Sequence, residues 1–201
     1  MIIAVEDPLS EAVTRKLFAE IRPELPITSL LGNRGNRYLR AKARELNRVA
    51  AKVPTFLLTD LDSPAVCPPG LISDWLPDQP AANLLFRVAV IEVESWVLAD
   101  RERVAEFLGV PEHRIPAQTD TIGDPKQFLV NLARKSRSAA LRSDLVPATG
   151  STAAVGPMYN ARLTAFVAAY WSAIRASQAS GSLSRTVDRL SVAYSGAQTA
   201  G

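Results

Sequence analysis

Short apolar runs alternate with amphipathic helical patterns in the first half of this 201-residue chain, and this alternation restricts the fold more than any other feature. Four runs have the length and composition of strands that are buried on both faces. These expected strands cover residues 2–5, 27–31, 55–59 and 84–91. Because helical patterns separate them, we expect βαβ units and a parallel sheet of about four strands, which is an α/β fold.

The segments between and after these runs have the residue spacing of helices. In residues 36–53, for example, Leu39, Ala43 and Leu46 recur on one face. The expected helices cover residues 8–21, 36–53, 94–99, 101–108, 124–137, 157–176 and 182–192, with a short helical turn at 71–76. We therefore expect an α/β core of residues 1–108 and a basic helical extension of residues 109–201 that packs on it, with residues 195–201 as a frayed tail.

Composition excludes several classes of protein. Hydrophobic residues make up 47% of the chain and charged residues 21%, which is typical of a globular domain and excludes a disordered chain. No segment resembles a membrane span or a signal peptide, so we expect a cytoplasmic protein without membrane contact. The single cysteine, Cys67, excludes an intramolecular disulfide, and the single histidine, His113, disfavours zinc sites and Ser-His-Asp triads.

Carboxylates follow three of the four expected strands: Glu6, Asp60 and Glu92. Asp62 and Glu94 come two residues after the last two of these. Because the carboxyl ends of parallel strands lie along one edge, we expect these side chains to converge there. Asp60 and Asp62, two apart in an extended segment, are expected to point the same way. Converging carboxylates repel one another unless a cation lies between them, and oxygen-only ligands favour Mg²⁺ or Mn²⁺.

A carboxylate after a strand also often caps the next helix, and we expect this role for Asp7 and Asp100. For the five carboxylates named above we favour a chemical role instead of capping, because they occur at three strand ends that are expected to share one edge of the sheet. The expected catalytic residues are Glu6, Asp60, Asp62, Glu92 and Glu94. The expected metal ligands are Glu6, Asp60, Asp62 and Glu92.

These motifs resemble the Toprim fold, which topoisomerases, primases, recombination proteins and the nucleases of the OLD group share. Glu6 and the Asp60-Leu61-Asp62 segment carry the resemblance, together with Glu-Val-Glu-Ser-Trp-Val-Leu-Ala-Asp at residues 92–100. Residues 124–126 and 156–160 are also similar to a bacterial Toprim-like family of unknown function.

The resemblance implies roles for the acidic residues. Glu6 would be a general acid/base or a metal ligand, and Asp60 and Asp62 would be Mg²⁺ ligands. Glu92 or Glu94 would complete the cluster. The chain departs from the Toprim pattern at Asp7, where a glycine is common, and a residue other than glycine disfavours close phosphate contact there.

Two basic stretches are expected to bind a polyanion. Residues 33–52 contain seven Lys or Arg residues and one acid. This stretch begins in a glycine-containing turn, residues 32–36, whose N–H groups could contact phosphate. The second basic stretch covers residues 126–142. The expected nucleic-acid-binding residues are Arg34, Arg37, Arg40, Arg44 and Arg48 in the first stretch, and Lys126, Arg134, Lys135 and Arg137 in the second. The alternative is that both stretches are solvated helix faces.

Together these patterns favour a Mg²⁺- or Mn²⁺-dependent nuclease that cleaves phosphodiester bonds. Hydrolysis is favoured over transesterification, because none of the four tyrosines has the context of a covalent nucleophile. Two alternatives stay open. The chain could be a non-catalytic Toprim-fold module that recognises a protein or RNA partner, or a phosphohydrolase of small molecules.

Overall fold

Four parallel strands form one sheet in the computed structural model, which describes residues 1–63 and 65–194. The strands are β1 (Ile2–Val5), β2 (Ser29–Gly32), β3 (Thr55–Asp60) and β4 (Leu84–Ala89), in the spatial order β2-β1-β3-β4. Every residue of β3 is buried, because helices cover both faces of the sheet. The α/β fold class predicted from the sequence is confirmed. The predicted frayed tail lies outside the described residues.

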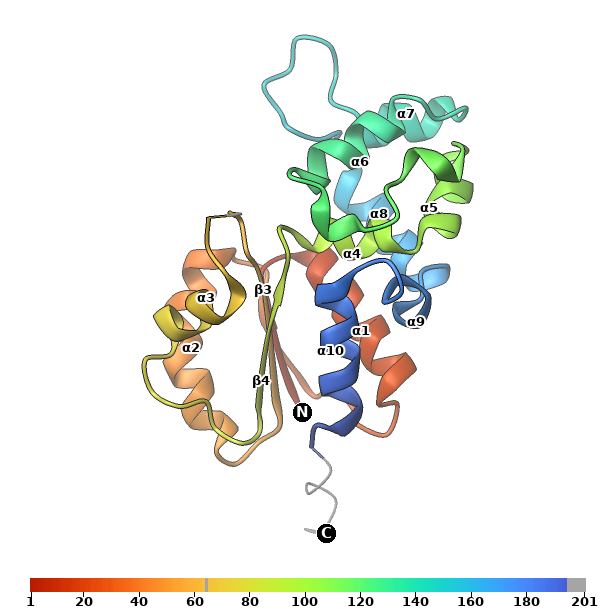
Figure 1. The fold of residues 1–201 in the computed structure, drawn as a ribbon. Coiled ribbons are helices and arrows are strands. Elements are labelled where there is room, and N and C mark those ends of the chain that lie inside the picture. Colours follow the sequence, from red (N-terminus) through yellow and green to blue (C-terminus); the bar gives the residue numbers. More distant parts are fainter. Residues whose placement is uncertain (64, 195–201) are drawn as a thin grey trace.

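Helices lie on both faces of the sheet (Figure 1). One face is covered by α2 (Asn36–Ala50) and α3 (Pro68–Trp75), and the other by α1 (Pro8–Ile21) and α10 (Gly181–Val192). A second group of helices lies beyond the carboxyl ends of the strands. It consists of α4 (Val93–Ala99), α5 (Arg101–Leu108), α6 (Pro125–Ala133), α7 (Ala139–Leu145) and α8 (Tyr159–Ala169), with 3₁₀ turns η1 (Glu112–Arg114) and η2 (Thr119–Thr121). The short helix α9 (Ala173–Ala176) lies lower, beside α1 and α10. None of the described helices is long and apolar enough to cross a membrane.

The last helix returns from this upper group to the sheet, as Figure 1 shows for α10. The Arg87 side chain of β4 donates to the Thr186 hydroxyl of α10 at 3.1 Å, and the Tyr194 hydroxyl donates to the Thr55 carbonyl at 2.8 Å. Of the two hydrophobic clusters among the described residues, the larger one extends from β1 to Tyr194. The extension covers part of the sheet as well as packing beside the α/β core.

The long helix predicted over residues 157–176 is wrong, because α8 ends at Ala169 and α9 begins at Ala173. Trp171 between them is fully buried and donates from its indole N–H to the Trp96 carbonyl at 3.1 Å. Ser172 then has an extended backbone and caps α9. Burial of the tryptophan thus turns the chain where the apolar pattern alone favours continuation. Trp96 and Trp171 are both core residues, as predicted.

Other boundaries differ for local reasons. The helix predicted to end near residue 137 ends at Ala133, and Ser138 caps a separate helix, α7, that the sequence analysis missed. The last helix is capped by Ser180 instead of Ser182 or Ser184. The predicted cap Asp7 is confirmed, since its carboxylate accepts from the Ser10 N–H at 2.7 Å.

Candidate functional site

The strand order reverses direction between β1 and β3, because the chain proceeds from β1 to β2 on one side and then to β3 on the other. Open parallel sheets bind ligands beyond the carboxyl ends of the strands at such a point. Glu6 directly follows β1, and Asp60 is the last residue of β3. The structure brings these two residues together, since Glu6 Oε1 accepts a hydrogen bond from the Asp60 backbone N–H at 2.9 Å.

Asp60 is the more buried of the pair, with 7% of the residue exposed. Its Oδ1 accepts from the backbone N–H of Val93, the first residue of α4, at 2.8 Å. Burial raises the pKa of Asp60 well above its usual value, and the charges of Glu6 and Glu94 raise it further. Burial also raises the pKa of Glu6, although hydrogen bonds from the Thr59 hydroxyl and the Asp60 N–H oppose the shift. Both carboxyls therefore hold protons more strongly than free ones.

Asp62 does not extend the strand, contrary to the expectation that it would point the same way as Asp60. β3 ends at Asp60, and Asp62 has a left-handed backbone with a φ of 59°. Its exposed side chain accepts a hydrogen bond at 3.2 Å from Asn36, the first residue of α2. Although the residue is exposed, neighbouring atoms partly desolvate its carboxyl, which raises the pKa of Asp62, and the charge of Glu92 raises it further. Asp62 thus lies at the side of the site nearest to α2.

Lys126 lies between the other two predicted carboxylates. Its Nζ is 2.9 Å from Glu92 Oε1 and 3.5 Å from Glu94 Oε1, and its backbone N–H donates to Glu92 Oε2 at 3.0 Å. Although burial lowers the pKa of Lys126, Glu94 and Glu92 raise it overall above its usual value. A side chain predicted to contact nucleic acid therefore neutralises part of the acidic cluster.

Glu94 is the most deeply buried of the five carboxylates, with 1% exposed. Its Oε1 accepts from the Tyr159 hydroxyl at 3.3 Å, whereas its Oε2 has no hydrogen-bond partner among the described residues. Burial raises the pKa of Glu94 to about 7, although the Lys126 ammonium acts in the opposite direction. Glu94 therefore has an unfilled hydrogen-bonding position, and it titrates near neutral pH. We use the name acidic edge for Glu6, Asp60, Asp62, Glu92 and Glu94.

The donor atoms of the acidic edge are chemically suited to Mg²⁺ or Mn²⁺, because all are carboxylate oxygens. The unpartnered Glu94 Oε2 and the raised pKa of Asp60 are features that a nearby cation would relieve. Within residues 1–63 and 65–194, however, no three Asp, Glu, His or Cys side chains lie in a group that could hold a metal ion. Metal binding therefore requires the carboxylates to move closer to one another.

The predicted basic residues lie in two places. Arg34, Arg37, Arg40, Arg44 and Arg48 are all exposed on or just before α2. The first turn of α2 adjoins the acidic edge through Asn36, and the helix carries the arginines away from it. Arg40 pairs with Asp74 at 2.8 Å, beside an open hollow of about 480 Å³ that Arg37 and Arg44 also line.

The second basic group is separated from the acidic edge, except for Lys126. Arg134, Lys135 and Arg137 are exposed and follow the last residue of α6. Arg134 comes eight residues after Lys126, which corresponds to about 12 Å along a helix. These three side chains could therefore contact only a substrate that extends well beyond the site.

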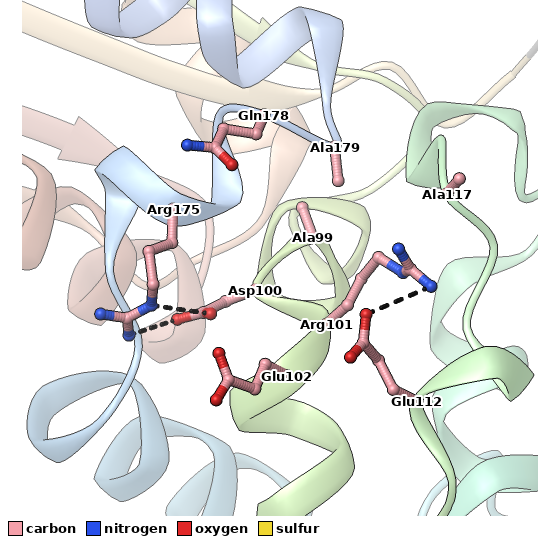
Figure 2. Close-up of a pocket in the computed structure, with 9 residues that line it drawn as sticks. All are labelled: Ala99, Asp100, Arg101, Glu102, Glu112, Ala117, Arg175, Gln178 and Ala179. Atoms are coloured by element: carbon pink, nitrogen blue, oxygen red, sulfur yellow. Dashed lines mark hydrogen bonds and ion pairs between the residues drawn. The ribbon is translucent and has the colours of Figure 1, made fainter.

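A second hollow, of about 320 Å³, lies between α5 and α9 (Figure 2). Asp100 is at its edge, and the prediction that its side chain caps α5 is wrong. The buried carboxylate instead accepts from Arg175 at 2.8 and 3.1 Å and from the Ser172 N–H at 2.9 Å. Arg101 faces Glu112 across the same hollow at 3.3 Å. The guanidinium groups of Arg175 and Arg101 are thus both paired with carboxylates. The Arg175–Asp100 pair connects α9 to the start of α5.

Sequence reasoning missed Thr59 and Asn36, which contact Glu6 and Asp62, respectively. Tyr159 lies in the segment 156–160 that the resemblance includes, but its contact with Glu94 was not predicted. Asn36 stands in the glycine-containing turn that the sequence analysis singled out, but nothing in the pattern indicated its partner. Comparison of the chain with protein-family models, curated proteins and solved structures finds no match.

Proposed function

We propose that the protein is a Mg²⁺- or Mn²⁺-dependent phosphodiesterase that cleaves nucleic acid at the acidic edge. The observation that carries the proposal is the pair of Glu6 and Asp60, which meet at the reversal point of a parallel sheet with raised pKa values. The resemblance of these residues to the Toprim family supports the same conclusion.

Glu6, Asp60 and Asp62 would hold the metal ion after the carboxylates draw together. When bound, the ion would supply positive charge that stabilises the reacting phosphate and the leaving oxygen. Asp62 is exposed and therefore has the freedom to move toward the other two. Asp60 is fixed by the Val93 N–H at the start of α4, so it provides the rigid part of the site.

The proton transfers fall to Glu6. The Thr59 hydroxyl and the Asp60 N–H orient its carboxylate, and its raised pKa brings it closer to neutral pH, where general acid/base catalysis is most effective. Lys126 is 35% exposed at its side chain and can exchange Glu92 for a phosphate oxygen of the substrate. Glu94 then keeps the lysine oriented toward the site.

The arginines of α2 give the substrate a path to the acidic edge. Arg34 and Arg37 lie at the end of α2 that adjoins Asp62 through Asn36, and the other arginines continue along the exposed side. Binding of a phosphate backbone by such a row is sequence-independent and weakens with salt. We therefore expect a polynucleotide to be bound more tightly than a mononucleotide.

A non-catalytic binding module is the second candidate, and the position of Lys126 favours it. The ammonium already neutralises Glu92 and Glu94, so part of the acidic edge is stable without a metal ion. In this alternative the fold and the basic row of α2 recognise RNA or a protein, and the carboxylates have a structural role.

Cleavage of labelled DNA and RNA distinguishes the two candidates. The protein is incubated with Mg²⁺, with Mn²⁺ and with chelator, and wild type is compared with Glu6→Gln, Asp60→Asn and Asp62→Asn. Asp78→Asn, at an exposed loop residue outside the acidic edge, is the matched control.

We expect metal-dependent cleavage that Asp78→Asn retains and that each acidic-edge variant reduces at least about a hundredfold. Binding without cleavage that is unaffected by the three variants would instead support the module. Cleavage of bis(p-nitrophenyl) phosphate without cleavage of either nucleic acid would support the phosphohydrolase of small molecules.

A further inference from the structure

Three arginines lie together where the last helix packs alongside β4 (Figure 1). Arg87 is the one charged residue of β4 and is half-buried, and its Nε donates to the Thr186 hydroxyl of α10 at 3.1 Å. Arg185 precedes Thr186, and Arg189 follows it by almost one helical turn. Residues four apart on a helix are neighbours, so both exposed arginines of α10 flank the contact with Arg87. We use the name arginine triad for Arg87, Arg185 and Arg189.

No carboxylate pairs with the arginine triad in the part of the chain that the structure describes. The ion pairs of residues 1–63 and 65–194 include none of the three arginines. Asp188 lies on the same helix but pairs with neither neighbour, and Asp120, near the first turn of α10, accepts from the Ser180 hydroxyl and the Ser182 N–H. Residues 195–201 contain no Asp or Glu. The positive charge of the triad is therefore not balanced by side chains of this chain.

Other arginines that lie against the core are satisfied internally. Arg22 is buried and donates to the carbonyls of Leu190 and Ala193, and Arg175 binds Asp100 through two nitrogens. Arg87 differs, because only its Nε has a hydrogen-bond partner among the described residues. Its two terminal nitrogens are left as donors for a ligand.

The charges of the triad also act on one another. Burial lowers the pKa of Arg87, and the charges of Arg185 and Arg189 lower it further. A guanidinium group nevertheless stays ionised at neutral pH. Three cations thus repel one another around a half-buried group, and a bound anion would remove this repulsion.

We propose that the arginine triad is a binding site for a phosphate group that carries two negative charges. A guanidinium fork matches two oxygens of a phosphate, and three cations balance a dianion better than the single charge of a phosphodiester. Inorganic phosphate and the terminal phosphate of a nucleotide or nucleic acid share this chemistry. The triad lies on the face of the sheet that α10 covers, opposite to the arginines of α2. It would bind phosphate whether or not the acidic edge cleaves nucleic acid.

Calorimetric titration with inorganic phosphate at low ionic strength tests the site. Arg185→Gln and Arg189→Gln each remove one charge at an exposed position, and glutamine forms helices about as well as arginine. Arg114→Gln, at an exposed arginine of η1, is the matched control, and Arg44→Gln tests the hollow beside α2. We expect each triad variant to weaken phosphate binding at least about tenfold, because each removes a charged donor. Arg114→Gln and Arg44→Gln should bind as wild type does.

Melting temperatures distinguish a binding site from a structural role. Without phosphate, Arg185→Gln and Arg189→Gln should melt no lower than wild type, because the loss of one charge reduces repulsion. Phosphate should raise the melting temperature of wild type more than sodium chloride of equal ionic strength does. A wild type that binds no phosphate overturns the proposal, as does unchanged affinity in both triad variants. Loss of binding in Arg44→Gln alone also overturns it and assigns phosphate to the hollow beside α2.

Fluorescence anisotropy with labelled oligonucleotides identifies the source of the phosphate. A 5′-phosphorylated strand is compared with a 5′-hydroxyl strand of the same sequence, in the presence of chelator so that neither is cleaved. Tighter binding of the phosphorylated strand that Arg189→Gln removes would support the triad as a site for a nucleic-acid end. Equal binding of the two strands, with inorganic phosphate still bound, would support it as a site for small phosphate compounds.

Discussion

Replacing Glu94 by glutamine is expected to remove a pH-dependent loss of stability. Glu94 is 1% exposed, and burial raises the pKa of its carboxyl from 4.5 to about 7. Between these two values the folded state binds a proton that the unfolded chain has released. The free energy of unfolding of wild type therefore falls as the pH rises through this window. A difference of about 2.5 pH units, at about 1.4 kcal/mol per unit, corresponds to about 3 kcal/mol.

Urea unfolding at closely spaced pH values measures this effect. The glutamine carries no charge, so the free energy of unfolding of Glu94→Gln minus that of wild type should grow by about 3 kcal/mol between pH 4.5 and 8. Taking this difference largely removes the contributions of other carboxyls, which titrate in both proteins. Glu102→Gln, at an exposed residue of α5, is the control and should follow wild type. Parallel curves for wild type and Glu94→Gln would refute the inference that Glu94 is buried as an ionisable carboxyl.

Two further substitutions test other parts of the site. Lys126→Met removes the cation that lowers the pKa of Glu94, so in the same urea experiment the variant should lose stability over a window that still begins near pH 4.5 but ends at a higher pH than in wild type, with a larger total loss. Gly32→Ala should lower the free energy of unfolding by about 3 kcal/mol, because Gly32 has a φ of +139° and an added Cβ would lie 1.8 Å from the Val5 carbonyl oxygen. Gly123→Ala, where an added Cβ meets no atom within 4 Å, should change urea stability far less.

Strand β3 could be predicted from the sequence because it is buried along its whole length. Every residue from Thr55 to Asp60 is buried, so the strand stands out as an apolar run whatever surrounds it. The break between α8 and α9 could not be predicted in this way. It depends on Trp171, whose indole contacts Trp96, a residue that is distant in sequence. Local periodicity carries no information about such a contact.

The same distinction applies to the candidate site. The positions of Glu6 and Asp60 follow from a general property of parallel sheets, whose strands end along one edge. The position of Lys126 does not, because its contact with Glu92 depends on how the extension folds over that edge. From the sequence, Lys126 belonged to a basic stretch with Arg134 and Arg137, but only the lysine reaches the acidic edge.

Lys126 and a divalent ion meet the same electrostatic requirement, since either one reduces repulsion among the carboxylates of the acidic edge. An ion that binds only the folded protein raises its melting temperature by mass action. In the proposed nuclease, Mg²⁺ or Mn²⁺ should raise the melting temperature of wild type, because Glu6, Asp60 and Asp62 bind it while Lys126 stays on Glu92 and Glu94. If the ion stabilises Lys126→Met alone, the lysine substitutes for the metal in wild type, and the acidic edge has the structural role expected of a binding module.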